Sequence, residues 1–255
     1  MRRATAGARY HAHLMKSLTL PLLAFALLGF SISPVARSQE PTPDPPLDSI
    51  AQRARPCIAC HGDQGRATPE GYFPRIAGKP AGYLFNQLTG FRDGRRFFPE
   101  MTFLVERQRD DYLRALAEYF AHVELPYAAP VRPQASSTAL ERGRELVMNG
   151  DTSRSIPACK ACHGEQLMGV LPATPALLGL SPDYLIAQLG GWANGTRHAL
   201  QPDCMANIIK NLGSEDIHAV TAWLAAQQVP ANAHPQAAFN EPPPVQCGSI
   251  EATRR

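Results

Sequence analysis

The sequence predicts an all-α fold made of two similar domains in tandem. Three observations support this prediction: a short motif of two cysteines and a histidine occurs twice, the segments after the two motifs match without a gap, and apolar residues recur at helical spacing between turn signals. The expected organisation is a leader at 1–38, a first domain at 47–125, a linker at 126–138, a second domain at 139–229 and a proline-rich tail at 230–255.

The repeated motif reads CIACH at 57–61 and CKACH at 159–163. One turn of helix places the two sulfurs on the same side, where they can add to the vinyl groups of a haem, and the adjoining histidine then reaches the iron. A single copy also fits a zinc or thiol-redox site, but two copies, each followed by glycine and an acidic residue, favour c-type haem. We therefore predict two covalently attached haem c groups. Their attachment residues are Cys57, Cys60, Cys159 and Cys162, and their axial histidines are His61 and His163.

The segment 73–96 matches the segment 174–197 at nine positions, which indicates an internal duplication. The matched pairs are Pro74/Pro175, Gly78/Gly179, Tyr83/Tyr184, Leu84/Leu185, Gln87/Gln188, Leu88/Leu189, Gly90/Gly191, Gly94/Gly195 and Arg96/Arg197. Each copy spans about 90 residues, a length at which a hydrophobic core is marginal unless something such as a large apolar macrocycle is added to it.

Apolar spacing and capping residues predict helices in both copies. In the second copy they cover 139–149, 183–192 and 214–226, with Ser181 and Pro182 as the N-cap and first-turn proline of the middle one. In the first copy they cover 83–91 and 111–123, while the opening helix, 47–54, is short and ends close to Pro56. Residues 39–46 and 230–255 are expected to be irregular and solvated.

The sixth iron ligand decides between an electron carrier and a catalyst. Met101 and Met205 lie in equivalent predicted loops before the last helix of each copy, so we expect them to be the second axial ligands. A thioether favours Fe(II) and raises the reduction potential, and a filled site excludes peroxide and oxygen. The alternatives are that either methionine only fills the core and that His198 replaces Met205.

Matched residues also suggest the surroundings of the haems. A ligating histidine usually donates its other ring nitrogen to a carbonyl, and Pro74 and Pro175 are candidates to present it, or are simple turn prolines. Arg96 and Arg197 are expected to pair with haem propionates or with carboxylates across the domain interface. Tyr83 and Tyr184 are interpreted as core aromatics rather than propionate partners.

The first 38 residues have the pattern of a secretory signal. A basic stretch precedes an apolar run at 18–32, and small residues at Ala36 and Ser38 predict cleavage before Gln39, with Met15 as an alternative start. The run is short for a membrane span, although an uncleaved anchor is the rival interpretation. We therefore expect a periplasmic protein whose membrane contact is at most peripheral.

Export agrees with the two cysteines outside the motifs, Cys204 and Cys247. In an oxidising compartment they are expected to form a disulfide, which would tie the tail beside the second haem pocket; the alternative is two free thiols.

The formal charge of +3 comes from the leader. Without its five basic residues, 20 basic residues face 22 acidic ones, which argues against nucleic acid as a partner. The segment 51–125 carries +2 and the segment 139–230 carries −2, a dipole that would orient docking. The alternative is that the arginines of the first segment are ordinary solvated residues.

Together, the two CxxCH-Gly motifs, the repeated Pro-x-x-x-Gly followed by Tyr-Leu-x-x-Gln-Leu, and a methionine before each last helix resemble the tandem dihaem class I cytochromes c, cytochrome c4 among them. The resemblance covers about residues 50–228. It implies two cytochrome c folds related by a pseudo-twofold axis, haems that face each other across the interface, and a periplasmic shuttle that delivers electrons to terminal oxidases. The short first helix, the long tail and Cys204 beside Met205 depart from the family pattern.

The leading prediction is a dihaem electron carrier without catalytic residues, which accepts electrons from a quinol-oxidising complex or a dehydrogenase and passes them to a terminal oxidase. The second is the electron-accepting cytochrome subunit of a periplasmic dehydrogenase, which needs the same haems. The third is a dihaem peroxidase, which needs an open or displaceable iron site, so Met101 and Met205 argue against it.

Overall fold

A computed structural model of the chain describes residues 46 and 48–251, and the expected leader lies outside these residues. Within them the regular structure is helical: eleven α-helices and two 3-10 turns, with β-pairing limited to isolated bridges. Among the described residues, no helix has the length and apolar character needed to cross a membrane.

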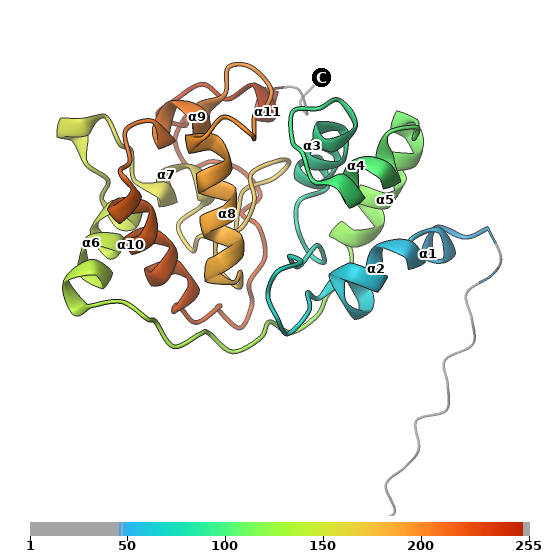
Figure 1. Cartoon of the computed structure of the whole chain (residues 1–255), viewed down its shortest axis with the longest axis horizontal. Helices are drawn as coiled ribbons and strands as arrows, with labels where there is room; N and C mark the ends of the chain where they lie inside the picture. The colour runs from blue at the N-terminus through green and yellow to red at the C-terminus, as the bar shows by residue number, and fades with distance from the viewer. Residues whose placement is uncertain (1–45, 47, 252–255) are drawn as a thin grey trace, which may run out of the picture. The chain divides into compact units, whose positions relative to one another are not determined.

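The first repeat is built from five helices (Figure 1). They are α1 (Ile50–Arg53), α2 (Arg55–His61), α3 (Ala81–Arg92), α4 (Pro99–Val105) and α5 (Asp110–Ala121). Helix α3 packs against both α4 and α5. Leu84, Leu116 and Phe120 are buried between α3 and α5, and Leu113 is fully buried beside Phe91.

The second repeat has five corresponding helices. They are α6 (Ser137–Met148), α7 (Cys159–His163), α8 (Pro182–Ala193), α9 (Cys204–Ile209) and α10 (Ser214–Ala225). Helix α10 packs against α6 and α8 (Figure 1). The approach to α6 is close: a Cβ on Gly143 would lie 2.2 Å from the carbonyl oxygen of Ala219. Gly143 therefore sets the distance between the two helices.

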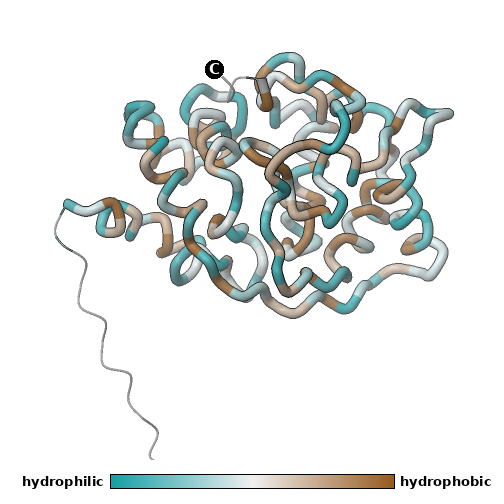
Figure 2. Tube along the Cα trace, turned by 180° about the vertical axis from the view of Figure 1, so that it is seen from behind, coloured by the Kyte–Doolittle hydropathy of each residue, from teal (hydrophilic) through white to brown (hydrophobic). Residues whose placement is uncertain are grey.

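Local sequence explains where these helices begin. Ser136 accepts a hydrogen bond from the N–H of Ala139 and starts α6, and Ser181 accepts one from Tyr184 and starts α8, with Pro182 in its first turn. In the first repeat the opening helix is divided into α1 and α2, and Pro56 occupies the first turn of α2. Along many helices brown and teal alternate in Figure 2, as amphipathic helices require.

Two expectations about irregular segments are wrong. Met101 and Met205 do not lie in loops, because Pro99 begins a short helix, α4, in the first repeat and Asp203 caps a short helix, α9, in the second. The tail is not solvated throughout: residues 248–251 form α11 (Gly248–Glu251), and Ile250 is buried.

Gln236 exchanges backbone hydrogen bonds with Gly169 and Leu171, and three further contacts hold the end of the tail. A disulfide joins Cys204 to Cys247, with the two Cα atoms 5.0 Å apart. The N–H of Gly248 donates to the carbonyl of Pro202 at 3.0 Å, and the side-chain amide of Asn86, in α3, donates to the carbonyl of Ser249 at 3.1 Å. The tail thus connects the second repeat to a helix of the first.

Candidate haem sites and the polar interface between the repeats

Each CxxCH motif lies on a short helix that ends directly after its histidine. The next residue, Gly62 or Gly164, has a positive φ of 75° or 84°. The chain then turns back, so that the N–H of Ala67 donates to the carbonyl of His61 at 2.8 Å and that of Gly169 donates to the carbonyl of His163 at 2.9 Å. The two motifs therefore have the same local fold.

Both histidines are buried and oriented by a proline carbonyl. The Nδ1 of His61 lies 2.8 Å from the oxygen of Pro74, and the Nδ1 of His163 lies 2.8 Å from the oxygen of Pro175. A carbonyl only accepts, so Nδ1 carries the proton and Nε2 keeps a free lone pair for a metal. Burial lowers the pKa of both imidazoles, which favours the neutral form that ligates iron.

The motif cysteines are free and do not pair with each other. Burial raises the pKa of Cys57 to about 11 and that of Cys159 to about 12, so both remain protonated thiols. Because reactive redox cysteines need a lowered pKa, these surroundings do not favour a thiol-redox site.

In the second repeat these groups face one cavity with about 1600 Å³ of empty space, part of it open to solvent. Cys159, Cys162 and His163 line it, and so does Met205 from α9. The remaining wall is mostly apolar, with Leu146, Ile156, Leu189, Ile208, Val220 and Leu224 among its residues. Two thiols, one imidazole and one thioether around an apolar cavity are the donor set of a haem c site. The exposed His198 also lines the cavity.

In the first repeat Met101 is half-buried on α4 and packs against the cluster of Phe91, Val105 and Leu113. The imidazole of His61 packs near the ring of Phe73, with the two ring centroids 6.2 Å apart. His122, His218 and His234 are exposed.

The two matched arginines meet at the interface between the repeats. Arg96 and Arg197 form an antiparallel bridge, and each guanidinium donates to two glutamine oxygens. Arg96 donates to Gln87 at 2.9 Å and to Gln188 at 2.6 Å, whereas Arg197 donates to Gln188 at 2.6 Å and to Gln87 at 3.0 Å. The expected partners were haem propionates or carboxylates across the interface. Among the described residues, glutamines and not carboxylates accept from the two arginines across it.

This interface carries uncompensated positive charge. Arg197 and Lys79 are buried, and neither they nor Arg96 form an ion pair with a carboxylate within residues 48–251. Burial, and then repulsion from Arg96, lower the pKa of Arg197 to about 10. Tyr83 and Tyr184 are half-buried beside these cations, and burial raises the pKa of Tyr184 to about 12. All five side chains line the cavity that holds His163.

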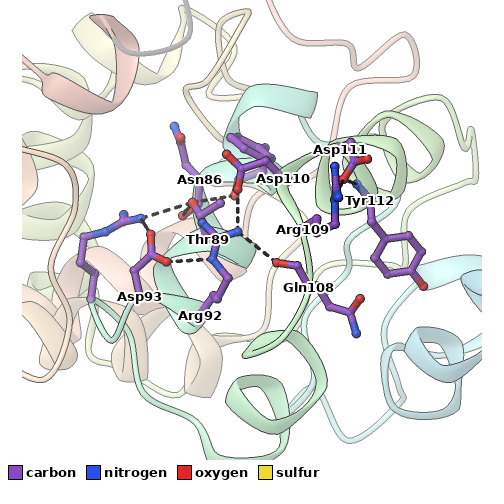
Figure 3. A network of polar contacts seen from close by, with 11 residues as sticks. Asn86, Thr89, Arg92, Asp93, Gln108, Arg109, Asp110, Asp111 and Tyr112 are labelled. Carbon is purple, nitrogen blue, oxygen red and sulfur yellow. Dashed lines mark hydrogen bonds and ion pairs between the residues drawn. The ribbon is translucent and has the colours of Figure 1, made fainter.

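Two other arginines of the first repeat, Arg92 and Arg95, have carboxylate partners. Arg92, the last residue of α3, pairs with the adjacent Asp93 and with Asp110 at the start of α5, and it donates to the carbonyl of Gln108 at 3.1 Å (Figure 3). Arg95 also pairs with Asp93, at 3.2 Å. Local pairing therefore offsets much of the charge that these arginines contribute.

One buried carboxylate near Met205 was not anticipated. Asp203 is 3 % exposed and accepts hydrogen bonds from the N–H of Ala199 at 2.6 Å, the N–H of Ala206 at 3.0 Å and the indole of Trp192 at 3.2 Å. It holds the first turn of α9 and thus the position of Met205. An aspartate at a helix N-cap is the sequence signal that could have identified it.

No protein-family model matches the chain. Among curated proteins it is similar to a thiosulfate dehydrogenase electron acceptor of Thiomonas intermedia, with 36% identity over 68% of this chain and 79% of that protein. It is also similar to cytochrome c4 of Pseudomonas aeruginosa, with 31% identity over 68% of this chain and 84% of that protein. The chain belongs to the cytochrome c4 family. The expectations of an all-α class I cytochrome c fold, of covalently bound haem c and of an electron-transfer function are thereby confirmed.

Two solved structures have a similar fold. Reduced cytochrome c4 from Pseudomonas stutzeri matches with a TM-score of 0.61 and 26% identity, over 70% of this chain and 97% of that chain. The thiosulfate dehydrogenase TsdBA from Marichromatium purpuratum matches with a TM-score of 0.61 and 29% identity over 68% of this chain, which spans 36% of that longer chain.

Proposed function

We propose that the chain is a periplasmic dihaem electron carrier with one haem c in each repeat. The first domain would cover 47–125 and the second 139–229, joined by the linker at 126–138, with the leader cleaved between Ser38 and Gln39. The observation that carries the proposal is the duplicated ligand geometry: in both repeats a buried histidine on a CxxCH helix donates Nδ1–H to a proline carbonyl at 2.8 Å.

Each haem would be held by four side chains of its own repeat. Cys57 and Cys60, or Cys159 and Cys162, would form the thioethers. His61 and Met101, or His163 and Met205, would bind the iron. When bound, the haems supply one-electron Fe(III)/Fe(II) couples at potentials raised by the thioether. Pro74 and Pro175 fix the tautomer of the histidines, and Asp203 holds α9 so that Met205 stays directed at the cavity.

The positive interface would bind the haem propionates. Arg96, Arg197 and Lys79 lie at the cavity without a carboxylate partner among the described residues, and the buried Arg197 and Lys79 need anions. Gln87 and Gln188 hold the two guanidiniums side by side, where both would be available to the carboxylate groups of a haem.

For the partner, we propose a thiosulfate-oxidising dehydrogenase as the electron donor and a terminal oxidase as the acceptor. The support is similarity: a relative from Stutzerimonas stutzeri named thiosulfate dehydrogenase electron acceptor is 34% identical over 83% of this chain and 96% of that protein. The second candidate is a general carrier fed by a quinol-oxidising complex, which the similarity to cytochrome c4 favours.

Reduction kinetics separate these candidates. The oxidised holoprotein is mixed with a thiosulfate dehydrogenase and thiosulfate, or with a quinol-oxidising complex and quinol, and the rise of the reduced haem band is followed by stopped flow. We expect faster reduction by the dehydrogenase, at both haems. Faster reduction by the quinol-oxidising complex would favour the general carrier, and turnover of peroxide by the reduced protein would contradict both.

A further inference from the structure

A buried arginine follows the proline that orients His61. Arg75 is 4 % exposed, and its guanidinium donates three hydrogen bonds to backbone carbonyls. The acceptors are Ala77 at 3.1 Å, Pro126 at 3.0 Å and Leu125 at 2.6 Å. The same guanidinium stacks on the ring of Tyr127, 4.0 Å from its centroid. Arg75 thus ties the ligand loop of the first repeat to the start of the linker.

The charge of Arg75 is fixed and has no counter-ion. Within residues 48–251 no carboxylate forms an ion pair with it, and its hydrogen-bond partners are neutral. Burial lowers the pKa of Arg75, but a guanidinium remains protonated in proteins. The residue that carries this permanent positive charge directly follows Pro74, whose carbonyl accepts the Nδ1 proton of His61.

Tyr127 also contacts the second repeat. A Cβ on Gly179 would lie 2.4 Å from Cδ1 of Tyr127, so this ring packs directly on the glycine backbone. Tyr127 also packs against the core cluster of the second repeat, which contains Leu178 and Val229. Gly179 follows Pro175, whose carbonyl orients His163, by four residues. Arg75 and Tyr127 therefore join the two ligand loops by direct contact.

The second repeat has no equivalent charge. In the gapless match Arg75 corresponds to Ala176, a buried residue whose side chain has no polar atom. Any electrostatic effect of this position is consequently confined to one of the two repeats.

We propose that Arg75 is a positioning residue that raises the reduction potential of the first haem, and that its stacking on Tyr127 anchors the linker to both ligand loops. The proposal rests on the proposed role of His61 as an axial ligand. A fixed positive charge in a medium of low dielectric favours the less positive iron, Fe(II), over Fe(III). Because the charge is buried, salt does not screen it as it screens surface arginines.

The test compares three variants of the full-length holoprotein, with the potential of each haem measured by spectroelectrochemistry and assigned by NMR of the haem methyl groups. Arg75→Gln removes the charge, and we expect the Fe(II)/Fe(III) equilibrium constant of the first haem to fall about tenfold, a decrease of 59 mV for one electron. Arg75→Lys keeps the charge but lacks the planar guanidinium with its several N–H donors, so we expect the equilibrium constant of the first haem to change by less than about twofold. Arg107→Gln removes a first-repeat charge that is 89 % exposed, and we expect less than a twofold change. The potential of the second haem stays constant in all three.

Two results would overturn the proposal. One is an unchanged first potential in Arg75→Gln, and the other is an equal loss in Arg75→Gln and Arg75→Lys, which indicates a structural role. Unfolding of Arg75→Gln is detected by circular dichroism, and Arg75→Lys then decides: its potential matches that of the parent protein if the charge acts as proposed. Failure of the partner assignment does not affect these measurements, because the electrode replaces donor and acceptor. Loss of His61 ligation is recognised independently by the optical spectrum.

Discussion

Removal of the Cys204–Cys247 disulfide gives the most quantitative test of how the tail is held. The bond closes a loop with a sequence separation of 43 residues. In the chain-entropy description a loop of this length lowers the free energy of the folded state relative to the unfolded state by about 4 kcal/mol at 25 °C. The closed loop contains α10, whose packing against α6 and α8 organises the core of the second repeat.

The perturbation is the double substitution of Cys204→Ser and Cys247→Ser in the oxidised holoprotein. Substitution is preferable to a chemical reductant, because a reductant also reduces the haem iron. Unfolding is followed in guanidinium chloride by circular dichroism at the helix band. We expect the free energy of unfolding to fall by about 4 kcal/mol, with an increase in denaturant slope if the unfolded chain expands.

Each single substitution serves as the matched control, since either one breaks the same bond and must give nearly the same loss as the pair. A loss below about 1 kcal/mol would refute the reasoning, because it would mean that the other contacts of the tail, from Gly248 to Pro202 and from Asn86 to Ser249, fix it without the covalent bond.

Three further predictions concern packing, charge and the interface. Gly143→Val places side-chain atoms where even a Cβ would lie 2.2 Å from a backbone oxygen, so we expect the free energy of unfolding, measured in urea, to fall by about 3 kcal/mol. The control is Gly190→Ala on α8, where the space for a Cβ is open. We expect it to leave the free energy of unfolding unchanged or to raise it by up to about 1 kcal/mol. Asp216 accepts from Arg142 at 2.9 Å and pairs with Arg154 at 2.7 Å; burial raises its pKa, the two guanidiniums lower it by more, and the net pKa is below the ordinary 3.8. Because the folded-state pKa is lowered, the stabilisation is present above the unfolded-state pKa and is lost as the pH falls through the folded-state value. Asp216→Asn should thus lower the free energy of unfolding by about 2 kcal/mol at pH 7 and by progressively less below about pH 4. A difference between variant and parent protein that does not change with pH would contradict the assignment. Gln188→Leu leaves Arg96 and Arg197 each without one hydrogen-bond acceptor and should lower the free energy of unfolding by about 1–3 kcal/mol. The isosteric exchange Gln188→Glu supplies a carboxylate and should lower it by less.

The sequence predicted the features that depend on local chemistry. Helix α8 begins within one residue of the predicted start, because Ser181 and Pro182 are a local cap whose effect needs no distant partner. The motif helices and the similar turns after His61 and His163 also follow from residues adjacent in the chain. The all-α class could be predicted because apolar residues recur at helical spacing in the predicted elements of both repeats.

Features that depend on contacts between distant segments could not be predicted in the same way. Arg75 reads as an ordinary loop arginine until the fold brings residues 125–127 around it, 50 positions along the chain. Gln87 and Gln188 were visible as a matched pair, but nothing local indicated that each would accept from both arginines. The proline content of the tail favoured a solvated segment, whereas the disulfide and buried Ile250 hold it against the protein.

The central claim, two haems each with histidine and methionine ligands, is tested most directly by the weak far-red absorption band of oxidised haem that has an Fe(III)–methionine bond. Its amplitude per haem is measured in the parent protein, in Met101→Ala, in Met205→Ala and in the double variant, with haem content determined on the same samples. The account predicts two haems per chain, a band that falls by about half in each single variant, and no band in the double variant. A band that survives the double substitution, or high-spin iron with peroxide turnover in the parent protein, would contradict it.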